Sequence, residues 1–180
     1  SVEHIFQDIL NYKTLGIFWD YDGGGAASTA LLIKFFEHIG HPFKFYIPNR
    51  VTEGYGPSIK AFEKLMKNDL STIITVDCGT LSYKSIDYAN LNKVNIIVID
   101  HHQAEPNLPK AFSIINPNRI DDSSNFKMLC ATSLTFLFLL GLDKKLKNKN
   151  WYKLKNISPP ILSSYLDLVA LATICDVVPL

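Results

Sequence analysis

Apolar, β-branched runs alternate with stretches of helical periodicity along the first two thirds of this chain. Strands are predicted over residues 17–21, 43–47, 73–76, 94–99 and 112–115, and helices between the first four over residues 26–39, 57–66 and 82–91. Strands that are apolar throughout are typically buried on both faces, and strand–helix–strand alternation requires parallel pairing with right-handed crossovers. The pattern therefore predicts an α/β fold with a doubly wound, mainly parallel sheet flanked by helices.

The last third of the chain is less regular. Residues 130–140 predict a helix that is apolar nearly all round and therefore buried. Residues 143–156 carry six lysines with almost no aliphatic periodicity, which predicts an exposed lysine-rich loop, either solvated or in contact with phosphate. Pro159 and Pro160 then open a last predicted helix through residue 174.

The length of 180 residues suits one sizeable domain, which we assign to residues 1–180. The chain ends at residues 176–180 directly after a strongly apolar segment, so we expect it to be a fragment of a longer protein. A hydrophobic content of 47% with 19% charged residues is globular composition. The net charge of +1 gives no global attraction to nucleic acid, so any such binding must rest on local patches.

The sequence also bears on the compartment. Its longest apolar stretch, residues 134–142, is too short to span a bilayer, and residues 1–4 lack the basic and then apolar order of a signal peptide. Cys78, Cys130 and Cys175 have no paired zinc-ligand spacing, which favours reduced thiols. We therefore expect a cytoplasmic protein that does not associate with membranes.

Three predicted strands end in acidic side chains. The run from residue 95 ends in Asp100-His101-His102, the first strand is followed by Asp20 and Asp22, and the third by Asp77. Parallel sheets bind ligands outside the carboxyl ends of their strands, so these groups should converge on one crevice. A single aspartate there could simply cap a helix, but three adjacent polar groups cannot all cap one turn.

The residue types at these positions favour metal chemistry. Asp22, Asp77, His101 and Asp176 offer oxygen and imidazole ligands that suit Mn²⁺ or Mg²⁺. Two such ions can clamp a phosphoryl group while a water attacks in line, so the set favours phosphoester hydrolysis. Residues 23–25 are three glycines before a helix, which could cradle a phosphate through backbone N–H groups or form a tight turn with positive φ.

Four short motifs, in order, resemble those of the DHH phosphoesterases, and within them the RecJ family of single-strand-specific exonucleases. The motifs are Asp20-Tyr21-Asp22 with residues 26–30, residues 76–79, Asp100-His101-His102, and residues 167–173 with 176–180. Supporting stretches at residues 46–50, 53–56, 115–117 and 129–131 are also similar to the RecJ family. The resemblance covers the chain from about residue 16 to its end.

The resemblance implies a role for each matched residue. It implies metal ligation by Asp22, Asp77, His101 and Asp176, with Asp20 as a candidate further ligand. It also implies that His102 binds a metal or the scissile phosphate, that Asp100 orients a neighbouring imidazole, and that Arg50 contacts phosphate. The implied cofactor is Mn²⁺, or Mg²⁺, as two ions. The implied activity is 5′-to-3′ release of mononucleotides from single-stranded DNA in repair and recombination, with other repair or replication proteins as further partners.

One position departs from the family pattern. The first motif normally reads DYDxDG, and Gly24 stands where the third carboxylate is expected. Water or Asp20 could fill the gap, the site could work with one ion, or the domain could be inactive and bind nucleic acid or a partner. A small-substrate enzyme of the oligoribonuclease or pyrophosphatase type is a further alternative. The DHH-associated domain that the resemblance implies lies outside this sequence, so we expect weak DNA binding and slow turnover from this chain alone.

Overall fold

The computed structural model describes residues 1–67 and 69–179. Its strands are β1 (Leu15–Trp19), β2 (Phe43–Tyr46), β3 (Thr72–Val76), β4 (Asn95–Ile99) and β5 (Ser113–Ile115). Its helices are α1 (Val2–Leu10), α2 (Gly23–His38), α3 (Arg50–Glu53), α4 (Ile59–Met66), α5 (Tyr83–Leu91), α6 (Ala131–Asn148), α7 (Trp151–Lys155), the 3₁₀ helix η1 (Leu162–Tyr165) and α8 (Leu166–Cys175).

The strands form one parallel sheet in the order β2-β1-β3-β4-β5. Every residue of β1 and β3 is buried, as is all of β4 after Asn95, which explains why these strands read as continuous apolar runs. Sequence order reverses direction between β1 and β3, so the sheet has a switch point there. The predicted fold class, a doubly wound parallel sheet flanked by helices, is confirmed.

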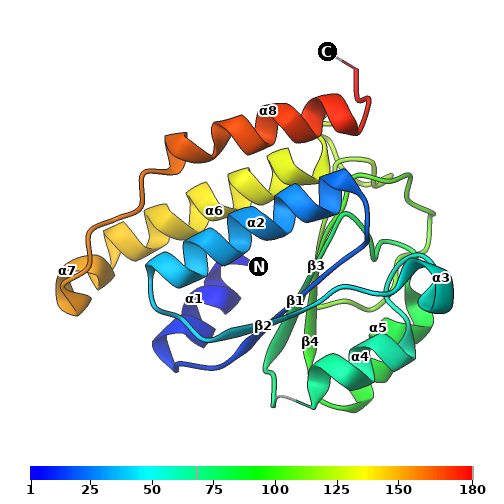
Figure 1. The fold of residues 1–180 in the computed structure, drawn as a ribbon, viewed down its shortest axis with the longest axis horizontal. Coiled ribbons are helices and arrows are strands. Elements are labelled where there is room, and N and C mark those ends of the chain that lie inside the picture. Colours follow the sequence, from blue (N-terminus) through cyan, green and yellow to red (C-terminus); the bar gives the residue numbers. More distant parts are fainter. Residues whose placement is uncertain (68, 180) are drawn as a thin grey trace.

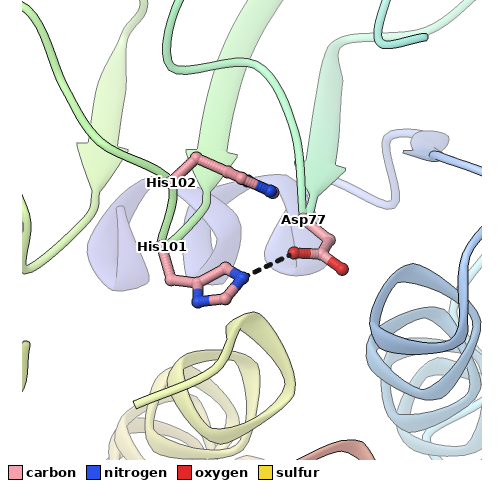
Figure 2. Close-up of side chains that lie close together, drawn as sticks. All are labelled: Asp77, His101 and His102. Atoms are coloured by element: carbon pink, nitrogen blue, oxygen red, sulfur yellow. Dashed lines mark ion pairs between the residues drawn. The ribbon is translucent and has the colours of Figure 1, made fainter. Parts of the chain in front are cut away.

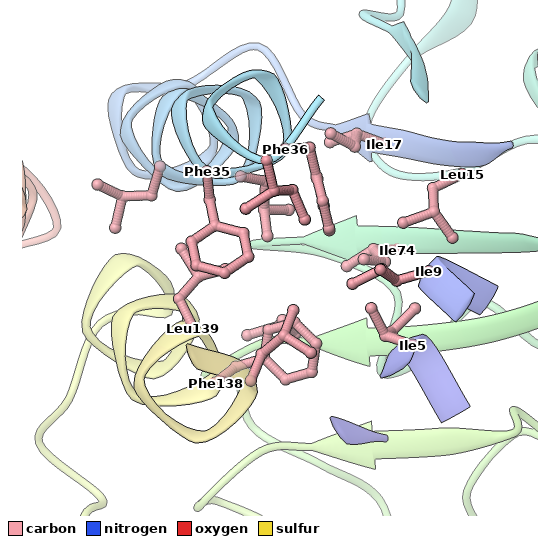
Figure 3. Packing of buried hydrophobic residues seen from close by; sticks show 14 of the residues in the cluster. Ile5, Ile9, Leu15, Ile17, Phe35, Phe36, Ile74, Phe138 and Leu139 are labelled. Carbon is pink, nitrogen blue, oxygen red and sulfur yellow. The ribbon is translucent and has the colours of Figure 1, made fainter. Parts of the chain in front are cut away.

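Helices cover both faces of the sheet (Figure 1). On one face α1, α2 and α6 pack over the strands, and Phe35 of α2, Leu139 of α6 and Ile74 of β3 belong to the larger core cluster (Figure 3). The other face is covered by α4 and α5, where Phe62 and Ile86 lie against strand residues such as Val98. Outside the first layer, α8 rests on α2 and α6.

The predicted lysine-rich loop at residues 143–156 is wrong, because α6 continues to Asn148 and α7 follows it. Buried side chains recur there among exposed lysines, which makes the segment amphipathic. Leu146 is fully buried, and the hydroxyl of Tyr152 donates to Oδ1 of Asp143 at 2.8 Å. The lysines are themselves good helix formers, so their number did not argue against a helix.

Other helices also differ from those predicted. Residues 23–25 are the first turn of α2, so the alternative of a tight turn with positive φ is wrong. The last helix does not begin at the prolines: η1 starts at Leu162 and passes directly into α8. Helices α1 and α3 were not predicted. Among the described residues, none of the helices combines the length and the apolar character that crossing a bilayer requires.

Candidate metal centre

The acidic side chains expected at the strand ends do lie around one place. Asp20 and Asp22 follow β1, Asp77 follows β3, and residues 100–102 follow β4, so they flank the switch point between β1 and β3. Asp176 reaches the same place from the C-terminal cap of α8. The fold therefore assembles one cluster from segments up to more than 150 residues apart in the sequence.

Asp77, His101 and Asp176 form the centre of this cluster. Nε2 of His101 lies 3.2 Å from Oδ1 of Asp77 and 4.0 Å from Oδ2 of Asp176. Figure 2 shows His101 and His102 leaving the loop after β4 while Asp77 projects from the end of β3. The ligand atoms of Asp77, His101 and His102 lie within 4.8 Å of one another, close enough to hold one metal ion.

Burial governs the protonation of this cluster. It raises the pKa of Asp77, with a further rise from the charge of Asp22 and a partial lowering by His101. It also raises the pKa of Asp176, again with a contribution from Asp77. The close contact with the Asp77 carboxylate raises the pKa of His101 against the opposing effect of burial. Without a cation these carboxylates therefore resist carrying negative charge side by side.

The backbone around Asp77 is bent to present its side chain. Asp77 has φ of +60° and Gly79 has φ of +112°, so the chain turns sharply as it leaves β3. The N–H of Asp77 donates to the carbonyl of Ile99 at 2.9 Å, which ties this turn to the end of β4. Aspartate tolerates the left-handed region better than most residues, and a strained conformation of this kind is typical of functional sites.

Asp100 and His102 form a separate, tightly bonded pair. Nδ1 of His102 donates to Oδ1 of Asp100 at 2.7 Å, and the backbone N–H groups of both histidines donate to the same oxygen. Burial would raise the pKa of Asp100, but hydrogen bonds from His102 and Thr80 outweigh it and lower the pKa to about 2. The hydrogen bond from Asp100 raises the pKa of His102 to about 9.

Two asparagines hold this histidine loop, and sequence reasoning assigned them no role. The buried Nδ2 of Asn116 donates to Oγ1 of Thr80 and to the carbonyl of His102, both at 2.9 Å. Nδ2 of Asn118 donates to the carbonyl of His101 at 2.5 Å. The available signal was an Asn-Pro-Asn run directly after a predicted strand, a position where amides commonly stabilise turns.

Tyr55 is a third residue to which the sequence assigned no role. Its hydroxyl lies 3.3 Å from Nε2 of His102 and donates to the carbonyl of Asp77 at 3.3 Å. A cavity of about 350 Å³ lies beside it, lined by Tyr55, Gly56, Cys78, Gly79, Thr80, Leu81, Ser82, Asp100 and His102. Its proximity to the cluster makes this cavity a place where a substrate could reach His102.

Asp20 and Asp22 contribute differently. Asp22 is exposed and caps α2, with Oδ1 accepting from the N–H of Gly25 at 2.9 Å. Asp20 is fully buried, and its Oδ1 accepts from the N–H of Tyr21 at 2.7 Å. Burial raises the pKa of Asp20. Arg50, the predicted phosphate contact, begins α3, but its side chain lies outside the described part of the structure.

The donor set fits a divalent cation. Within the described ranges, three buried carboxylate oxygens of this cluster accept no hydrogen bond: Oδ2 of Asp20, Oδ1 of Asp77 and Oδ2 of Asp176. Oδ1 of Asp77 has only its ion-pair contact with His101. Leaving buried anionic oxygens unpaired is costly, whereas a bound cation would satisfy them. Hard carboxylate oxygens with one or two imidazoles are the ligands that Mn²⁺ and Mg²⁺ accept.

A family model described as the N-terminal domain of the DHH family matches residues 14–173. The chain belongs to the DHH family. Its DHH domain is 35% identical, over the full chain, to the single-stranded-DNA-specific exonuclease RecJ of Salmonella typhimurium, and covers 31% of that protein. It is 31% identical over the full chain to the Bacillus subtilis RecJ, of which it covers 21%. The chain thus spans about a third or less of the length of these relatives.

Solved structures agree with this assignment. The DHH domain superposes on a manganese-bound crystal structure of exonuclease RecJ with a TM-score of 0.83 and 26% identity, covering 99% of this chain and 42% of that one. A Mn²⁺ complex of RecJ from Thermus thermophilus matches with a TM-score of 0.76 and 24% identity, covering 99% of this chain and 24% of that one. The second likeness shows the fold alone.

Proposed function

We propose that this chain is the catalytic DHH domain of a RecJ-like, metal-dependent exonuclease that hydrolyses single-stranded DNA from 5′ to 3′. The proposal rests on the convergence of Asp77, His101 and Asp176, whose buried carboxylate oxygens accept no hydrogen bond and would be satisfied by a cation. The similarity to RecJ over the full chain supports the choice of DNA as substrate. We propose DNA repair and recombination as the setting, with single-stranded DNA and repair or replication proteins as partners.

The residues of the cluster would have different roles in metal binding. Asp22, Asp77, His101 and Asp176 would hold the divalent cation, with Asp20 as the buried neighbour whose free oxygen adds to the anionic field. A bound Mn²⁺ or Mg²⁺ would supply Lewis-acid polarisation of a phosphodiester and lower the pKa of a water. Because these ligands come from β1, β3, β4 and α8, the whole sheet edge fixes their geometry.

His102 would contact the scissile phosphate. Asp100 holds its Nδ1 at 2.7 Å, so the ring can only present its Nε2 edge to a substrate. That edge lies beside Tyr55 at the cavity of about 350 Å³. Asp100 acts as a positioning residue, because it is 1% exposed and reaches substrate only through the histidine loop. We propose Arg50 as a further phosphate contact on the basis of the sequence motif alone.

The test uses the purified chain in excess over single-stranded DNA labelled at its 5′ end, with Mn²⁺ present. Labelled mononucleotide should be released early, whereas a label at the 3′ end should stay in long products. Asp77→Asn should slow release at least about 100-fold, since it removes a charged ligand. Asp87→Asn, an exposed aspartate on α5, is the matched control and should cut at the parent rate.

Other outcomes would change the assignment. If neither this chain nor Gly24→Asp releases nucleotide, the catalytic proposal fails. Faster cleavage of dinucleotides or pyrophosphate than of long DNA would move the chain to the small-substrate phosphoesterases.

Gly24 favours one second candidate, a DHH domain with impaired catalysis that binds DNA or a protein partner. Glycine offers no ligating atom at a position that faces Asp77 and Asp176, so the site has one carboxylate fewer than the family motif provides. Comparing the cleavage rate of the chain with that of Gly24→Asp separates the candidates. A large gain in the variant shows that the native site is impaired, and equal rates show that it is not.

A further inference from the structure

The backbone at Gly24 faces the carboxylates of the cluster directly. A Cβ atom at this position would lie 2.5 Å from Oδ1 and 2.7 Å from Oδ2 of Asp176, and it would overlap Oδ2 of Asp77. Real Cβ atoms essentially never come within 3.0 Å of another heavy atom. Asp77 and Asp176 therefore occupy the space that any side chain at position 24 would need.

The neighbouring glycines differ from Gly24 in what surrounds them. A Cβ at Gly25 would lie 2.8 Å from the carbonyl oxygen of Asp20, so a backbone atom excludes a side chain at position 25. A Cβ at Gly23 would meet Cys175 at 3.6 Å, an ordinary contact. The backbone of Gly24 is also held in place, because its carbonyl accepts hydrogen bonds from the hydroxyls of Ser28 at 2.8 Å and Thr132 at 3.1 Å. Of these three glycines, Gly24 is the one whose Cβ would lie within 3.0 Å of metal-site carboxylates.

The distances between the donors of the cluster can be compared with those in a metal site. Asp77 Oδ1 and Asp176 Oδ2 have no hydrogen-bond partner in the described structure, and they lie 3.2 and 4.0 Å from Nε2 of His101. Neighbouring ligands of one octahedral ion with bonds of about 2.1 Å stand roughly 3 Å apart, and opposite ligands roughly 4 Å apart. The observed spacings match ligands of one ion.

The remaining donors do not make a second set. Asp22 caps α2 through Oδ1, and its carboxylate lies against Asp77, so it belongs to the same set of ligands. Both ring nitrogens of His102 have partners, in Asp100 and Tyr55. Asp100 accepts from backbone N–H groups on both of its oxygens. Asp20 Oδ2 is partnerless, but one buried oxygen is a poor site for a second divalent ion.

From this geometry we propose that the centre binds one divalent cation per chain, through Asp22, Asp77, His101 and Asp176, and that Gly24 limits it to one. The inference rests on the proposed metal-dependent function and specifies the stoichiometry of its site. A carboxylate at position 24 would push Asp77 and Asp176 apart and add the anionic donor that a second ion requires.

The test is calorimetric titration of the metal-free chain with Mn²⁺, checked by the electron paramagnetic resonance spectrum of the bound ion. The parent chain should bind one Mn²⁺ with the spectrum of an isolated ion. Gly24→Asp should bind two with the spectrum of a coupled pair. Gly23→Asp is the matched control, since it adds the same charge one residue away beside Cys175, and it should still bind one.

Two ions on the parent chain, or an unchanged stoichiometry of one in Gly24→Asp, would overturn the inference while leaving the nuclease proposal standing. Binding of no ion to the parent would also overturn it. If Gly24→Asp does not fold without metal, the parent titration still decides. The nuclease proposal fails on a different readout, the absence of mononucleotide release.

Discussion

The ring of His102 donates through Nδ1 to Oδ1 of Asp100 at 2.7 Å, and that oxygen also accepts the backbone N–H of His102 itself at 3.2 Å. The carboxylate thus fixes both the ring and the loop that carries it. Because Asp100 is buried and His102 is about half exposed, the pair joins the sheet interior to the cavity beside Tyr55.

This pair makes the stability of the metal-free protein depend on pH. The pKa of His102 rises from 6.5 to about 9 on folding, so its contribution is fully present below pH 6.5 and is lost as the pH rises through about 9. The pKa of Asp100 falls from 3.8 to about 2, so its contribution is present above pH 3.8 and is lost as the pH falls through about 2. We expect the His102 contribution to be about 1 kcal/mol, because exposure to water weakens it.

Urea unfolding in EDTA measures this contribution. The free energy of unfolding of the parent minus that of His102→Gln should shrink by about 1 kcal/mol between pH 6.5 and pH 9. If this difference in unfolding free energy does not change with pH, the interaction of His102 with Asp100 is weaker than the raised pKa of His102 indicates.

Replacing Asp77 should stabilise the metal-free protein while abolishing its response to metal. Its buried carboxylate has a raised pKa, and asparagine removes the charge while keeping a residue that tolerates φ of +60°. Asp77→Asn should raise the free energy of unfolding in EDTA by about 1 kcal/mol, a size typical of stabilising substitutions at functional sites. Thermal unfolding with and without Mn²⁺ checks both parts.

The matched variant for this prediction is Asp77→Ala. It removes the same charge but places a residue that disfavours positive φ, so it should be about 1 kcal/mol less stable than Asp77→Asn. Equal stability of the two variants would show that the bent backbone costs nothing. Destabilisation by Asp77→Asn would show that its ion pair with His101 outweighs the burial cost.

The strands and their polar ends could be predicted from the sequence because buried β-branched runs have few other interpretations. Parallel pairing then brings Asp77 and His101 together without further information. The contacts of Tyr55 and Asn116 could not be predicted in this way, since they reach His102 across 47 and 14 positions through loops whose paths depend on tertiary packing. The helical structure of residues 143–156 was not predicted because the lysines outnumber the buried residues whose spacing would reveal a helical period.

Asn116 should prove necessary for the histidine loop. Asn116→Ala removes two donated hydrogen bonds and leaves the carbonyl of His102 and the hydroxyl of Thr80 without this partner in a buried setting. We expect a loss of about 2 kcal/mol in unfolding free energy and weaker Mn²⁺ binding, since the loop carries His101. Urea unfolding and Mn²⁺ titration measure the two effects, and Asn125→Ala, at an exposed position, should leave both unchanged.

The helical packing of residues 143–156 can be tested with two leucines of the same segment. Leu146 is fully buried in the larger core cluster, and Leu154 is 79% exposed. Leu146→Ala should cost about 3 kcal/mol, because it removes a buried side chain and leaves a cavity, whereas Leu154→Ala should change stability by less than about 0.5 kcal/mol. Urea unfolding at one pH compares them directly. Equal, small effects would mean that the segment is the exposed loop its lysines suggest. A large cost confined to Leu146 would show that the end of α6 packs into the core, as part of the helix against which α8, with Asp176 at its C-terminal cap, packs.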